Sequence, residues 1–389
     1  MQRLDSVTKL KTIPRVLSFF LYVFGINLQE HQAIPRDQIE KPQGLSRKKF
    51  CLRIPIVIVF YHCCGIFYFV YGFYSNVPWT FYAFATLDVL AFFVVVDLLY
   101  IRRKALKFLI KNFHLMPPIK DKRAKNCKCR EIHGLLAYTF TFALVYLLYG
   151  FLIFEDLSEV SMGANIFILR CLEFFLKLMY GLLYHIFVYV AMPVFMCFFA
   201  HVCLLIEEKS MMIKQSLELL LELKTFHFSQ IRRQRRMFCY LQKQTSEANS
   251  IFTEICFLWV SKSVFRSCMS AYELVKVPWH DTDWMLTGLV LFDTVYDVTS
   301  LLIVSYYGGR VSEIKTKILD SVIRLGAINQ LRIQGEHYLE ETHFFVTTVG
   351  SSDMSMMLWN IMPIRKSIAI NVLSVIVSYS IIIYQFNEQ

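Results

Sequence analysis

Charged residues are scarce in this chain of 389 residues, and their scarcity excludes an ordinary soluble enzyme. Asp, Glu, Lys and Arg make up 18% of the sequence, whereas hydrophobic residues make up 56%, including 35 Phe and 21 Tyr. The mean hydropathy is +0.45. A water-soluble domain of this length needs a larger share of charged surface residues. The composition therefore indicates a chain that lies largely within a membrane.

The motifs of common catalytic sites are absent as well. The sequence contains no Gly-x-Gly-x-x-Gly, no phosphate-binding loop and no His-Glu-x-x-His. The carboxylate-rich Trp279–Asp283 lies in a short turn and is most simply a solvated loop. Cys127-x-Cys129 lacks the second pair of ligands that a zinc site needs, and the eleven cysteines suggest no disulfide framework. We expect no enzyme, catalytic residue, metal or cofactor.

Apolar runs of spanning length recur along the chain. Each holds at least 20 residues, which is enough to cross a bilayer as an α-helix. We predict an all-α membrane protein with seven transmembrane helices. The predicted spans are Ile54–Tyr74, Trp79–Ile101, Leu135–Phe154, Gly181–Ile206, Ile251–Val275, Trp284–Tyr307 and Ser367–Phe386.

The basic residues predict the orientation of these helices. Of the 41 Lys and Arg, 36 lie in the segments 1–53, 102–133, 207–250 and 308–366. Positively charged loops stay in the cytoplasm, so we expect a cytoplasmic N-terminus and an extracellular C-terminus. The net charge of +11 is then a signal of topology and not of a nucleic-acid partner. The expected location is the cell membrane, which the chain crosses several times.

Four regions follow from this topology. Residues 1–53 form a cytoplasmic segment in which Val16–Leu28 is predicted to be an interfacial helix. Residues 54–307 hold the first six spans with their cytoplasmic loops 102–133 and 207–250. Residues 308–366 form a second cytoplasmic region, and residues 367–389 hold the last span and a short external tail.

An apolar stripe in the second cytoplasmic region predicts a partner helix. Within residues 311–334 it comprises Val311, Ile314, Ile318, Val322 and Leu325, at steps of three, four, four and three. The partner lies either in the same chain or in a neighbouring subunit.

The polar residues of the last predicted span form a single stripe. Ser367, Asn371, Ser374, Ser378 and Gln385 follow one another at steps of four, three, four and seven. This spacing places them on one side of a helix whose other positions are mostly Ile, Val and Leu. A spanning helix turns such a stripe toward water or protein and not toward lipid.

The end of this span resembles the C-terminus of insect gustatory receptors. That family ends in Thr-Tyr, five mostly apolar residues and Gln-Phe; here Tyr379, Gln385 and Phe386 match, and Ser378 replaces Thr. The resemblance implies a tetramer with a cytoplasmic anchor domain and a pore lined by the last helix. Thr347–Asp353 and Asn360–Pro363 form a longer approach to that helix than the family has, so the connection between anchor and pore is expected to differ.

The resemblance also implies a gate at Gln385 and Phe386, near the outer face. Rings of polar side chains let a partly hydrated ion pass, and rings of apolar side chains can close a pore by excluding water. Alternatively, the small polar residues help helices to pack. The predicted pore and gate residues are Ser374, Ser378, Tyr379, Ile381, Ile382, Gln385 and Phe386.

Four charged residues fall inside predicted spans. Lys262 and Arg266 are four residues apart in the fifth span, and Asp293 and Asp297 are four residues apart in the sixth. Charges in the membrane pair with one another or line a cavity. The four residues form either a salt-bridge cluster that fixes the fold or part of a ligand cavity.

Aromatic residues gather near the predicted outer ends of the spans. They are either interfacial anchors or the lining of a pocket for an organic ligand, which the resemblance also implies between helices two and six. His185 either faces this pocket or is a packed, hydrogen-bonded residue. The ligand-binding candidates are Trp79, Tyr82, Asp88, Tyr146, Tyr149, His185, Trp284, Asp293 and Asp297.

The sequence thus predicts a gustatory receptor in the membrane of a sensory neuron. We expect a ligand-gated, non-selective cation channel that detects a small tastant, with a preference for bitter compounds or contact pheromones. Its partners would be the tastant, membrane lipid and other gustatory receptor subunits in a homo- or hetero-tetramer. A seven-helix receptor coupled to a G protein is the alternative, disfavoured by the cytoplasmic N-terminus and the missing Asp-Arg-Tyr and Asn-Pro-x-x-Tyr motifs. A secondary transporter is disfavoured by the odd number of spans and the lack of a repeat.

Overall fold

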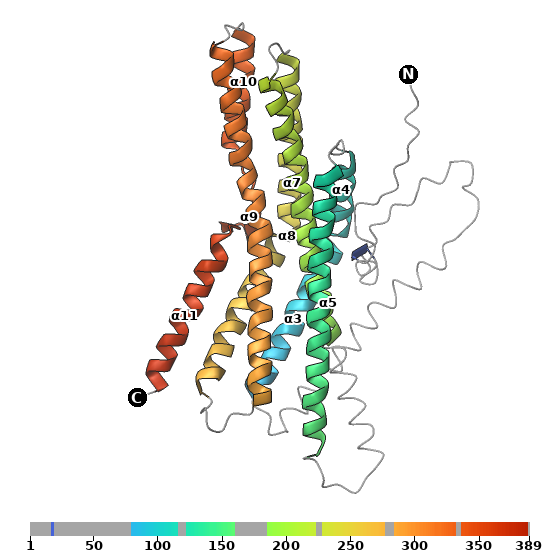
Figure 1. Cartoon of the computed structure of the whole chain (residues 1–389), viewed down its shortest axis with the longest axis vertical. Helices are drawn as coiled ribbons and strands as arrows, with labels where there is room; N and C mark the ends of the chain where they lie inside the picture. The colour runs from blue at the N-terminus through green and yellow to red at the C-terminus, as the bar shows by residue number, and fades with distance from the viewer. Residues whose placement is uncertain are drawn as a thin grey trace, which may run out of the picture. The chain divides into compact units, whose positions relative to one another are not determined.

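The computed structural model describes residues 17–18, 79–115, 122–159, 185–222, 228–276, 284–331 and 336–387. Nearly all of them are helical (Figure 1). The first predicted span, Ile54–Tyr74, and the turn Trp279–Asp283 lie outside the described residues. So does the predicted interfacial helix Val16–Leu28, apart from Leu17 and Ser18, which are helical.

The described part of each of the other predicted spans falls on a helix. Because a backbone in lipid must satisfy its own hydrogen bonds, long apolar runs favour helices. The helices that carry them are α3 (Trp79–Ile101), α5 (Lys122–Glu159), α7 (Met192–Glu222) with the π-helix Ile186–Ala191 before it, α8 (Phe228–Lys276), α9 (Trp284–Leu331) and α11 (Ser367–Asn387). Two further helices, α4 (Arg103–Leu115) and α10 (Glu336–Ser351), lie in the predicted cytoplasmic regions.

Three of the described helical stretches are long and apolar enough to cross a membrane by length and composition. They are Arg130–Leu148, Val188–Glu222 and Val290–Ala327, and two shorter apolar stretches are Leu90–Ile101 and Ser367–Ile382. In α8, Lys262 and Arg266 fall within the apolar half and lower its hydropathy.

A π-helical turn interrupts the fourth span immediately before its proline. The π-helix Ile186–Ala191 passes into α7 at Met192, and Pro193 is the second residue of α7. Proline donates no backbone hydrogen bond, and its ring crowds the carbonyl four residues earlier. The wider π-turn accommodates both effects, so the irregularity that a proline causes in a helix lies on the N-terminal side of Pro193.

The chain divides into two compact units. The first comprises residues 1–100 and 129–197, and the second comprises residues 101–128 and 198–389. In the first unit, Phe92 on α3 stacks against Phe195 on α7, with 6.4 Å between ring centroids. In the second unit, Phe199 on α7 meets Phe252 and Trp259 of α8 edge to face. These aromatic side chains are almost completely buried and form the cores of the two units.

Within the second unit, α10 runs beside the C-terminal half of α9 (Figure 1). The five residues of the 311–325 stripe are at most 3% exposed. Phe345 of α10 packs against Phe238 of α8, with 6.0 Å between centroids. Glu341 of α10 forms ion pairs with Arg235, at 2.8 Å, and Arg232, at 3.4 Å. The stripe is therefore covered within its own chain, which corrects the alternative that it faces a neighbouring subunit.

Candidate functional site

Among the described residues of the last helix, α11, only Ile368 and Ala369 near its start are buried. Ile370 is 70% exposed and Val375 is 59% exposed. Figure 1 shows α11 diverging from α9 toward the C-terminus. A helix that exposes large apolar side chains over most of its length requires lipid or another protein surface to cover them.

The predicted polar stripe lies on this uncovered helix. Ser374, Ser378 and Gln385 are all exposed. The Ser378 hydroxyl donates a hydrogen bond to the carbonyl of Ser374 at 2.8 Å, so its donor is satisfied by its own helix. The other predicted pore residues Tyr379, Ile381 and Ile382 are 41–54% exposed. The side chain of Phe386 lies outside the described residues.

A small β-hairpin joins α10 to α11. Strands β1 (Met357–Leu358) and β2 (Met362–Pro363) pair antiparallel, with Leu358 opposite Met362. The Ile361 amide donates to the Leu358 carbonyl at 2.8 Å and closes the turn. Trp359 and Asn360 have positive φ angles of 47° and 56°, in the left-handed region that tight hairpin turns often use. The sequence indicated an unusual connection here but not a hairpin, because the turn is Trp-Asn instead of the typical Asn-Gly.

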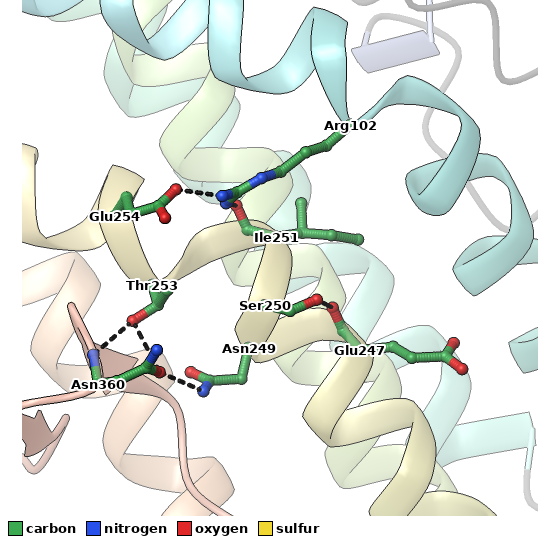
Figure 2. A network of polar contacts seen from close by, with 8 residues as sticks. All are labelled: Arg102, Glu247, Asn249, Ser250, Ile251, Thr253, Glu254 and Asn360. Carbon is green, nitrogen blue, oxygen red and sulfur yellow. Dashed lines mark hydrogen bonds and ion pairs between the residues drawn. The ribbon is translucent and has the colours of Figure 1, made fainter.

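Polar side chains of α8 fasten this hairpin (Figure 2). Asn249 accepts a hydrogen bond from the Met357 amide at 2.7 Å. The Thr253 hydroxyl accepts from the Asn360 amide at 3.0 Å, and the Thr253 carbonyl accepts from the Trp359 amide at 3.1 Å. Sequence reasoning missed both residues; the signal was two polar side chains four residues apart at the start of the fifth span.

The same stretch of α8 also holds the junction between α3 and α4 (Figure 2). Arg102, between these two helices, donates a hydrogen bond to the Ile251 carbonyl at 2.9 Å and pairs with Glu254. Residues 249–254 therefore contact both Arg102 and the hairpin before α11.

Helix α9 fastens the other side of the connection. Lys315 donates hydrogen bonds to the carbonyls of Gly350 and Ser352, at 2.8 and 2.6 Å, at the C-terminal end of α10. Lys366, one residue before α11, pairs with Glu313 at 2.6 Å. At Gly308 an added Cβ would lie only 2.5 Å from Cγ2 of Ile364. Close approach of α9 to the connection therefore requires glycine there.

The four membrane charges come together between α8 and α9. Arg266 lies 3.3 Å from Asp297 and also hydrogen-bonds Asp293. Lys262 lies 4.0 Å from Asp297, and its ammonium group lies 5.5 Å from the centroid of the Tyr296 ring. All four charged residues are at most 7% exposed. Two cations face two anions, so the formal charges of the cluster balance, and its ion pairs connect α8 to α9. A role in ligand binding stays a prediction.

The first unit brings two ligand candidates together. Tyr146 stacks on Tyr189 with 3.8 Å between centroids, and His185 stacks at 5.8 Å from Tyr146 and 5.6 Å from Tyr189. His185 also forms a hydrogen bond with the backbone of Ala143. Sequence reasoning missed Tyr189, which falls four residues after His185 on the same helical tract.

The structure does not bring the remaining ligand candidates together with Tyr146 and His185 among the described side chains. Asp88 is 1% exposed within α3. Trp79, Tyr82, Tyr149 and Trp284 lie on described helices, but their side chains are outside what the structure describes. Asp293 and Asp297 belong to the second unit and its ion cluster.

The comparisons with known proteins place the fold. No protein-family model matches the sequence, and no curated protein resembles it in sequence. Two solved structures of the insect olfactory receptor OR5 from Machilis hrabei do resemble it. The complex with eugenol has a TM-score of 0.72 at 11% identity and covers 96% of this chain and 98% of the receptor. The second has a TM-score of 0.73 at 12% identity, over 96% and 97% of the two chains. The all-α expectation is confirmed, and this chain shares the fold of an insect olfactory receptor over 96% of its length.

Proposed function

We propose that this chain is an insect chemoreceptor of the gustatory type that works as a ligand-gated, non-selective cation channel. The observation that carries the proposal is the state of α11. It is an apolar helix whose polar stripe, from Ser374 to Gln385, is exposed, and among its described residues only Ile368 and Ala369, near its start, are buried. Water and further copies of the same helix are the surroundings that suit such a stripe.

A pore follows when several copies turn the stripe toward one axis. Ser374, Ser378 and Gln385 then form polar rings over about 16 Å of helix, at 1.5 Å per residue. Ile381 adds an apolar ring between Ser378 and Gln385, which can close the path by excluding water. We propose a tetramer, as a homomer or with other gustatory receptor subunits, in the plasma membrane of a sensory neuron.

The ligand in this proposal is a small organic tastant. A receptor of the same fold was solved in complex with eugenol. The stacked rings of Tyr146, His185 and Tyr189 offer aromatic surface with few polar groups, which suits such a molecule. The gustatory assignment, with bitter compounds or contact pheromones as stimuli, rests on the C-terminal Tyr379, Gln385 and Phe386 pattern. No enzymatic activity or cofactor is part of the proposal.

Ligand binding would open the pore by favouring one arrangement of the helices over another. Helix α8 offers the route, because its residues 249–254 fasten both Arg102 and the hairpin before α11. Glu313 of α9 adds a second attachment through Lys366. A shift of α8 against α9 would therefore be transmitted to the start of α11.

Cysteine accessibility tests this proposal directly. Ser378→Cys places a thiol on the stripe, and Ser380→Cys places one about 200° away around the helix. Both serines donate to a carbonyl four residues earlier at 2.8 Å, and residues 367–387 contain no native cysteine. Whole-cell currents would be recorded during application of quinine, caffeine and eugenol, with a G-protein inhibitor present.

A channel predicts that a charged, membrane-impermeant thiol reagent blocks the current of Ser378→Cys and leaves that of Ser380→Cys nearly unchanged. The inhibitor should have no effect on either variant. Equal block of both variants would remove the stripe from the pore. A current that disappears with the inhibitor would replace the channel by the G-protein-coupled alternative.

A further inference from the structure

The tip of the hairpin exposes three large apolar side chains that the proposed channel does not use. Trp359 is 54% exposed, Ile361 is 70% exposed and Met362 is 48% exposed. They lie within the short stretch from Trp359 to Met362, in and directly after a turn that hydrogen bonds fasten to α8. An apolar group of this size in contact with water is unfavourable, so the tip needs a partner.

The hairpin lies where three helices change from polar to apolar sequence. It is fastened by Asn249 and Thr253, on either side of Ile251, where the apolar part of α8 begins. Ile364 approaches Gly308, directly after the apolar part of α9 ends at Tyr307. Helix α11 begins at Ser367. All three helices place the tip at the boundary between the apolar layer and water.

The turn gives no local reason for a tryptophan. Trp359 adopts a φ of 47°, in the left-handed region that only Gly, Asn and Asp enter readily. Its ring touches Phe257 edge to face at 4.9 Å, and about half of its surface stays exposed. Tryptophan is enriched at membrane interfaces because its large ring is apolar and its N–H is polar. The tryptophan side chain is therefore explained by a membrane interface around the turn and not by the backbone conformation of the turn.

A basic residue stands beside the apolar tip. Arg365 is exposed, lies two residues after β2 and forms no ion pair with any residue that the structure describes. Its neighbour Lys366 is already engaged by Glu313, and Lys315 is engaged by the carbonyls at the end of α10. Arg365 is thus available for an anionic group outside the chain.

We propose that the hairpin tip is a membrane anchor that inserts into the interface of the cytoplasmic leaflet. Trp359, Ile361 and Met362 enter the boundary between headgroups and acyl chains, and Arg365 binds the phosphate of an anionic lipid. The occupant is lipid and not a second copy of this chain, because apolar residues beside a free arginine match the layered chemistry of a leaflet. The inference rests on the membrane embedding in the proposed function but not on ion conduction.

Site-specific photo-crosslinking identifies the occupant. Benzoylphenylalanine would replace Ile361 in the full chain, reconstituted in phosphatidylcholine vesicles with or without phosphatidylserine. Leu358, in the same hairpin and 5% exposed, is the buried control. Ile370, which is 70% exposed on α11, is the control for embedding of that helix.

The proposal predicts phospholipid adducts at position 361 several-fold above those at position 358. Two results would overturn the anchor. One is an adduct at position 361 to a second copy of the chain, at twice its mass, and the other is a frequency of lipid adducts at position 361 no higher than at position 358. If position 370 also captured neither lipid nor a second copy, the membrane embedding of the proposed function would fail with it. Adducts at position 370 alone would overturn only the anchor.

The role of Arg365 has its own measurement. With phosphatidylserine present, adducts at position 361 should increase in the parent chain and in Arg365→Lys, but not in Arg365→Gln. An equal increase in Arg365→Gln would show that Arg365 does not recognise the headgroup. Both substitutions change an exposed side chain, so the fold should tolerate them.

Discussion

Removing Arg266 should destabilise the protein far more than removing any exposed arginine. Arg266→Met keeps an unbranched side chain but removes one of the two cations of the cluster and leaves Lys262, 4.0 Å from Asp297, as the other. Loss of one partner from a buried ion pair costs about 3–5 kcal/mol. Whole domains are stable by only about 5–15 kcal/mol, so the loss is a large fraction of the total.

The measurements would be the melting temperature of the detergent-solubilised chain and the fraction of the protein at the cell surface. Arg233→Met is the matched control, because it makes the same substitution on the same helix at an exposed position. The control should keep both values close to those of the parent, whereas Arg266→Met should lower both.

A second substitution tests the reason for the loss. Arg266→Met with Asp293→Asn removes one cation and one anion, so Lys262 and Asp297 remain as a neutral pair. Most of the lost stability should return. Two results would refute the view that charge balance holds α8 to α9. One is that Arg266→Met has the same melting temperature and surface fraction as Arg233→Met, and the other is that the double variant is no more stable than Arg266→Met.

Two further predictions concern the attachment of α11. Gly308→Ala should lower the melting temperature, because its Cβ would lie 2.5 Å from Ile364, and the additional substitution Ile364→Ala should suppress this effect. In the control Gly350→Ala the new Cβ meets nothing within 4 Å, so this substitution should raise the melting temperature through helix propensity. A stabilising effect of Gly308→Ala would contradict the close approach of Gly308 and Ile364. Thr253→Val removes the acceptor of the Asn360 amide, and leaving that amide unpaired costs about 1–3 kcal/mol of free energy. The substitution should therefore shift the tastant concentration that gives half-maximal current. Thr348→Val, which loses a hydroxyl that bonds only within its own exposed helix turn, should leave that concentration unchanged; equal shifts in both variants would exclude the hairpin from gating.

Apolar run length and periodicity were enough to predict most of the architecture. Helix α3 begins and ends at the predicted residues Trp79 and Ile101, and α11 begins at the predicted Ser367. These signals are local, because a helix in lipid satisfies its backbone within one segment and shows its faces at a period of 3.6 residues. The pairing of the charges in the fifth and sixth spans was also visible, since buried charges of opposite sign on successive helices have few other partners.

What the sequence determined by itself was therefore the helices, their polar and apolar faces, and the stripe from Ser374 to Gln385. Only the tertiary structure decided that the stripe from Val311 to Leu325 is covered by its own chain, because an amphipathic face does not specify its partner. The hairpin at Trp359 and Asn360 was likewise decided at that level. Its backbone conformation opposes the local preference of tryptophan, and bonds from Asn249 and Thr253, more than 100 residues away, hold it in place.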